Sequence, residues 1–112
     1  MALHEMIKNV KIIDEILVYL VDKGYKKVNI NFELNKHETK ILVTINNPKE
    51  NLVSFLKQDI SAERGEELEE YGWELMGEDH HSFALQQLGM LIDKVTINEK
   101  ENQVQLLLVR KM

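Results

Sequence analysis

Two segments of the chain alternate apolar and polar residues in steps of two, and this pattern constrains the fold more than any other feature. Residues 28–34 and 41–45 show the alternation on either side of the polar stretch NKHE. Successive side chains of a strand point to opposite faces, so the pattern predicts an antiparallel hairpin with one buried face. A second hairpin is predicted at residues 95–109 around the turn NEKEN, and its run LLLV indicates that the last strand lies centrally in the sheet.

Before the first hairpin, apolar residues recur every three or four positions. This spacing predicts an amphipathic helix, and Gly24 stands where a left-handed residue would end it. The alternative is a coiled-coil seam, because three heptads fit the same residues. We expect the apolar stripe of this helix to pack in the core; it consists of Leu3, Met6, Val10, Ile13, Leu17 and Leu20.

Two further helices are predicted between the hairpins. Asn47, Pro48 and Glu50 have the spacing of N-cap, N1 and N3 residues, so one helix is expected to start there. Residues 83–92 have helical spacing as well. Four strands in two hairpins, with helices on one face of the sheet, predict a two-layer α+β sandwich.

The length and composition are those of one ordinary domain. The chain has 112 residues, so residues 1–112 are interpreted as a single domain, and it has no cysteine for disulfides or thiolate chemistry. No apolar run near the N-terminus is long enough to span a bilayer, and no signal-peptide layout is present. We therefore expect a cytoplasmic protein without membrane contact.

The formal net charge of -5 is concentrated in a variable acidic segment, residues 61–79. Between Glu63 and Asp79, eight acidic residues stand against one basic residue. Such a segment repels phosphate backbones, and no Lys/Arg cluster elsewhere compensates, so nucleic acid is not an expected partner. The segment is interpreted as a solvated face or as a docking surface for a basic protein, with Tyr71 and Trp73 as candidate anchors.

The stretch EDHH, residues 78–81, places two carboxylates and two imidazoles before a predicted helix. Adjacent residues on a helix point about 100° apart, whereas zinc-binding helices use two histidines four positions apart. We therefore interpret the stretch as a helix entrance and predict no metal site. No catalytic residues are predicted, because Ser82, the one serine beside a histidine, has no oxyanion loop next to it.

Three segments resemble the histidine-kinase-type ATPase domain, the Bergerat fold of sensor kinases, anti-sigma factor kinases and gyrase B. The first, DEILVYLVDKGYKKVNINFEL, resembles the family's long helix and first core strand. The second, TKILVTINNPKEN, resembles the strand that ends at the ATP-binding motif. The third, HSFALQQLGMLIDKVTINEKENQVQLLLVRK, resembles the C-terminal lid, helix and hairpin of anti-sigma factor kinases. This resemblance implies binding of ATP and magnesium.

The chain departs from the family at each ATP-binding motif. Neither Asp14 nor Glu15 is followed four residues later by the asparagine that binds magnesium in the family. Asn46 and Asn47 stand where the adenine-binding aspartate would be, and DHHSFA lacks the glycines of a phosphate-binding loop. These departures predict that the ATP-binding motifs are missing and that no cofactor is bound.

The leading hypothesis is therefore a non-catalytic, histidine-kinase-ATPase-like regulatory or protein-interaction module of the cytoplasm. Its expected contact surfaces are the acidic segment from Glu63 to Asp79 and the apolar N-terminal helix. A homodimer through Leu3 to Leu20 is a third hypothesis. The alternative to all of these is a nucleotide-binding domain for ATP or ADP with an atypical pocket formed by Asn46, Asn47, His80, His81 and Ser82.

Overall fold

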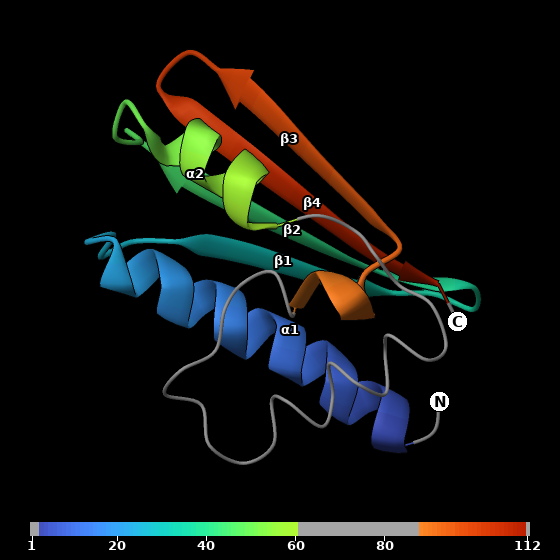
Figure 1. The fold of residues 1–112 in the computed structure, drawn as a ribbon. Helices are drawn as coiled ribbons and strands as arrows, with labels where there is room; N and C mark the ends of the chain where they lie inside the picture. Colours follow the sequence, from blue (N-terminus) through green and yellow to red (C-terminus); the bar gives the residue numbers. More distant parts are fainter. Residues whose placement is uncertain (1–2, 61–87, 112) are drawn as a thin grey trace.

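The computed structural model describes residues 3–60 and 88–111, which form two helices, one short 3-10 helix and a four-stranded sheet (Figure 1). The helices are α1 (Leu3–Asp22) and α2 (Leu52–Asp59), and the 3-10 helix η1 spans Gly89–Leu91. The strands are β1 (Asn29–Leu34), β2 (Glu38–Asn46), β3 (Lys94–Lys100) and β4 (Gln103–Lys111).

The sheet contains both predicted hairpins, joined through their second strands. The strand order is β1-β2-β4-β3, and every neighbouring pair is antiparallel. The predicted α+β fold with a four-stranded sheet of two hairpins is thus confirmed, as is the central position of the last strand. The two edges of the sheet are β1 and β3.

One face of the sheet carries the core. In β2, and in β4 as far as Leu108, buried residues alternate with half-buried ones. The buried residues oppose each other in the pairs Ile41↔Leu108, Val43↔Leu106 and Ile45↔Val104. Alternation follows from the period of two, which puts every second side chain on one face. Buried residues of both helices belong to the same core cluster, namely Ile12, Ile16 and Leu20 of α1 and Leu52 and Leu56 of α2.

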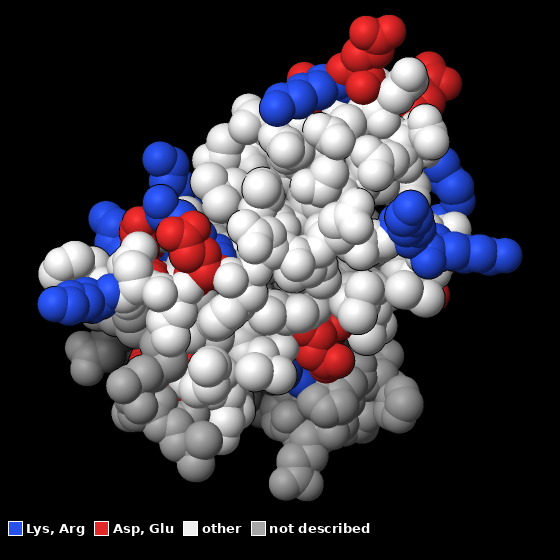
Figure 2. Space-filling model, turned by 180° about the vertical axis from the view of Figure 1, so that it is seen from behind, with Lys and Arg blue, Asp and Glu red and all other residues white. Residues whose placement is uncertain are grey.

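The opposite face of the sheet is uncharged over its centre. Its half-buried side chains include Leu42 and Thr44 of β2 and Gln105 and Leu107 of β4. Figure 2 shows the molecule from behind, where uncharged atoms fill the middle and charged groups lie mostly toward the margins.

The face that α1 buries differs from the expected stripe. Ile12 and Ile16 are fully buried together with Leu20, whereas Val10 and Leu17 are exposed. Both sides of this helix carry apolar residues at helical spacing, so the spacing alone fits two different faces. Packing on the rest of the fold decides between them.

The start of α2 also differs from the prediction. Asn47 is not an N-cap: it has a positive φ of 51°, its N–H donates to the carbonyl of Asn102 at 2.8 Å, and the helix begins at Leu52. Asparagine tolerates this left-handed conformation better than most residues, so it turns the chain at the end of β2. Of the helix predicted at residues 83–92, residues 83–87 lie outside the described part, Gly89–Leu91 is 3-10, and Ile92 is extended.

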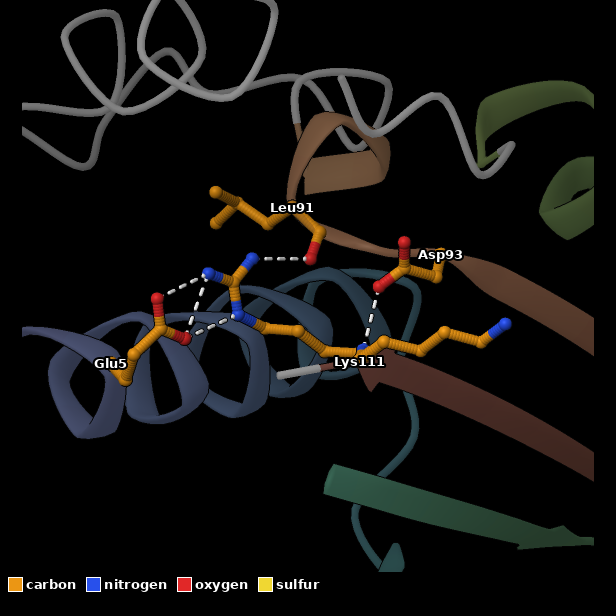
Figure 3. Close-up of polar contacts among 5 residues, drawn as sticks. Glu5, Leu91, Asp93 and Lys111 are labelled. Atoms are coloured by element: carbon orange, nitrogen blue, oxygen red, sulfur yellow. Dashed lines mark hydrogen bonds and ion pairs between the residues drawn. The ribbon is translucent and has the colours of Figure 1, made fainter. Parts of the chain in front are cut away.

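A buried arginine joins the end of the sheet to α1 and η1 (Figure 3). Arg110 of β4 is 1% exposed; its guanidinium donates to both carboxylate oxygens of Glu5 at 2.9 to 3.0 Å and to the carbonyl of Leu91 at 2.9 Å. Next to it, the N–H of Lys111 donates to the Asp93 carboxylate at 2.6 Å. A buried guanidinium needs such partners, because an uncompensated charge in the interior is costly.

Replacing Glu5→Gln should therefore destabilise the fold by about 1–3 kcal/mol, since the buried guanidinium loses its negative counter-charge but keeps a neutral acceptor. Urea unfolding followed by circular dichroism measures this free energy. The matched control is Glu101→Gln in the exposed β3–β4 turn, which should change stability by less than about 0.5 kcal/mol. Equal stability of the two variants would show that the pair contributes nothing.

Candidate interaction surface

The predicted nucleotide-pocket residues that the structure describes lie at one end of the sheet. Asn46 is the last residue of β2, and its Oδ1 accepts a hydrogen bond from Nε2 of Gln103 at 3.1 Å. Asn47 contacts the β3–β4 turn through its N–H. His80, His81 and Ser82 lie outside the described residues, as does the acidic segment with Tyr71 and Trp73. The geometry gives Asn46 and Asn47 a local role in holding the two hairpin ends together.

A small pocket lies between the end of α1 and the start of α2. Its volume is about 160 Å³, and it is lined by Lys23, Tyr25, Lys49, Asn51, Leu52 and Phe55. The ammonium group of Lys49 donates to the carbonyl of Lys23, and that of Lys23 lies 4.4 Å from the centre of the Phe55 ring. Carbonyls at the end of a helix attract cations, so these contacts hold α1 against the segment that leads into α2. Sequence reasoning did not identify this pocket, because its walls come from segments far apart in the chain.

A tyrosine links the two helices beside this pocket. The Tyr19 hydroxyl of α1 donates to Oδ2 of Asp59 in α2 at 2.7 Å. Burial raises the pKa of Tyr19 well above its ordinary value, and the hydrogen bond to Asp59 and the negative charge of that carboxylate raise it further. The contact therefore favours the neutral phenol in the folded state.

The most distinctive surface is apolar and lies on α1 and β1. The large hydrophobic side chains that are exposed in the described residues all belong to these two elements. On α1 the exposed fractions are 45% for Ile7, 56% for Val10, 39% for Leu17, 51% for Val18 and 57% for Val21. On β1 they are Phe32 and Leu34. Singly scattered apolar residues need no explanation, but a set gathered on one helix and on the edge strand that follows it is a candidate contact site.

The exposed residues of α1 form one side of the helix, which we name the α1 apolar arc. It consists of Ile7, Val10, Leu17, Val18 and Val21, with the exposed Asp14 among them. At 100° per residue these six positions fall within about 100° of the helix circumference.

The buried side of α1 carries polar residues among its apolar ones. Lys8, Asn9, Lys11 and Glu15 are all buried, and the Lys11 ammonium lies 2.9 Å from the Glu15 carboxylate. Glu5, which contacts Arg110, lies on this side too. Charged side chains thus share the buried side of α1 with Ile12, Ile16 and Leu20, while a second set of apolar residues faces outward. The sequence offered a signal for this arrangement, since the helix carries apolar residues on both sides.

Metal-binding side chains do not gather in the described part of the chain. No group of three or more His, Cys, Asp or Glu in that part of the chain is placed to hold a metal ion. No described helix is long and apolar enough to cross a membrane. The arrangement is suited to protein contact, because an exposed apolar helix face gains free energy when another surface removes it from water.

Comparison of the chain with protein-family models, with curated proteins and with solved structures gave no match.

The Tyr19–Asp59 contact predicts a pH-dependent difference between the wild type and Tyr19→Phe. Near neutral pH the variant should be less stable by about 1 kcal/mol, the usual contribution of one hydrogen bond. The folded pKa of Tyr19 is raised, so this stabilisation is complete below the unfolded value of about 10 and is lost as the pH rises above it.

The measurement is urea unfolding of both proteins between pH 7 and pH 11. The stability difference should shrink above about pH 10, where the unfolded tyrosine ionises and the folded one resists ionisation. Other titrating groups are common to both proteins and cancel in the difference. A difference that stays constant over this range would contradict the assigned contact.

Proposed function

We propose that this protein is a non-catalytic protein-interaction module of the cytoplasm that binds a protein partner through the α1 apolar arc. The observation that carries the proposal is that, within residues 3–60 and 88–111, the exposed large hydrophobic residues are confined to α1 and β1. A surface of this kind is costly to leave in water and is typical of recognition sites. A regulatory role is part of this proposal, in which binding through the α1 apolar arc changes what else the partner can contact.

The proposal does not depend on the resemblance to the histidine-kinase-type ATPase domain, which stays a prediction from the sequence. It also does not depend on the acidic segment from Glu63 to Asp79, the second contact surface expected from the sequence. The nucleotide-binding alternative has less to support it. In the described structure Asn46 and Asn47 are engaged with the β3–β4 hairpin, and the lysines of the nearby pocket contact α1 and Phe55.

The double variant Val10→Asp, Val21→Asp tests the proposal. Both side chains are more than half exposed, so the substitutions should leave the fold intact while placing two charges on the α1 apolar arc. Tagged wild type and variant are used to capture proteins from native cell extract, and the captured proteins are quantified by mass spectrometry. A protein lost with the variant is then purified and titrated against both forms, where we expect binding at least about tenfold weaker.

The matched control is Ser54→Asp, Gln58→Asp, which adds two negative charges at exposed positions of α2. It should capture the same proteins as the wild type. If all three forms capture the same set with equal yield, the α1 apolar arc is not the contact surface.

A further inference from the structure

The exposed residues of α1 follow the spacing of a helix-pairing seam. Five exposed residues follow one another at intervals of three, four, three and four positions: Ile7, Val10, Asp14, Leu17 and Val21. This is the repeat with which one helix packs along another, since it keeps one stripe facing the partner. Over this stretch the stripe is about 21 Å long, which matches a partner helix of about four turns.

Asp14 is the one charged residue in this stripe, and it lies at its midpoint. It lies seven positions after Ile7 and seven positions before Val21. Its carboxylate makes no hydrogen bond or ion pair with the rest of the described chain, because the nearby Lys11 is paired with Glu15. A partner that covers the stripe removes this carboxylate from water, which is costly unless the partner supplies a positive charge.

We infer that the partner is an amphipathic α-helix of another protein that carries a Lys or Arg in the middle of its apolar face, opposite Asp14. This inference rests on the proposed function and names the kind of partner. The flanking apolar residues supply binding free energy. The central charge pair makes binding selective for partners with a cation at that position, because an apolar or acidic residue there leaves Asp14 uncompensated.

A second copy of this chain does not fit the stripe. In a parallel pair of α1 helices the two Asp14 residues lie in the same layer. In an antiparallel pair centred on the stripe they meet on the two-fold axis, because Asp14 is its midpoint. Either arrangement sets like charges against each other within an apolar contact, which is unfavourable.

Three synthetic helical peptides with one shared apolar stripe, differing only in a central Lys, Leu or Glu, test the inference. Each is labelled with a fluorophore and titrated with the purified full-length protein by anisotropy. The Lys peptide should bind tightest and the Glu peptide at least about tenfold weaker. In Asp14→Lys the order should reverse, with the Glu peptide now tightest.

The control variant is Asp22→Lys, which changes an exposed carboxylate of the same helix outside the stripe. It should keep the wild-type order of the peptides, and Val10→Asp, Val21→Asp should weaken all three. Equal binding of the three peptides, or an unchanged order in Asp14→Lys, would overturn the inference. A stable dimer of the wild type in sedimentation, absent in the Val10→Asp, Val21→Asp variant, would overturn it as well.

These outcomes separate the inference from the proposed function. If no peptide binds but capture of a cellular protein still requires Val10 and Val21, the helical partner with a central cation is wrong and the interaction role stands. If neither peptide binding nor capture depends on these residues, the inference and the proposed function are both wrong.

Discussion

The fold depends on the antiparallel pairing of β2 with β4. Nine consecutive residue pairs, from Glu38↔Lys111 to Asn46↔Gln103, join two hairpins that lie far apart in the chain. A two-stranded hairpin alone is marginally stable in water, and three or more strands with a covered apolar face are needed for an independent structure. The pairing supplies this face, because its inward residues, including Ile41 and Leu108, meet there and give both helices a surface to pack on.

A charged contact at the end of this pairing fixes how α1 is rotated. Arg110 stands on the inward face of β4, beyond the last apolar pair, and holds Glu5 of α1 through both carboxylate oxygens. With Glu5 facing inward, Lys8 and Asn9 share its side of the helix, whereas Ile7 and Val10, two and five positions later, turn outward. The same contact that satisfies a buried guanidinium therefore leaves an apolar stripe at the surface.

In the described part of the molecule, several polar side chains are engaged in contacts within the fold. Its polar groups are used to hold the fold together: Asn46 and Asn47 join the hairpin ends, Lys49 binds the end of α1, and Tyr19 links α1 to α2. Its surface instead offers apolar residues in a row with one charge among them. The proposed helical partner would contact this row, and such binding requires no reacting group.

The sequence by itself determined the elements that have a local period: the first helix, both hairpins and the central place of β4. Periods of two and of 3.6 are set by backbone geometry, so they can be recognised without knowing the neighbours. The apolar N-terminal helix was also predicted to be a contact surface, which stays a prediction, and its stripe was assigned to the core, which the exposure of Val10 and Leu17 contradicts.

Only the tertiary structure decided which side of α1 is buried, where α2 begins and how the pocket at Lys23 and Lys49 is formed. Ile12 and Ile16 on one side and Val10 and Leu17 on the other are equally apolar, so local spacing cannot choose between them. The choice comes from Arg110, 105 residues away from Glu5 along the chain, because burying a guanidinium demands a carboxylate at one place in space. Asn47 similarly turns the chain to meet Asn102, a contact that no local pattern encodes.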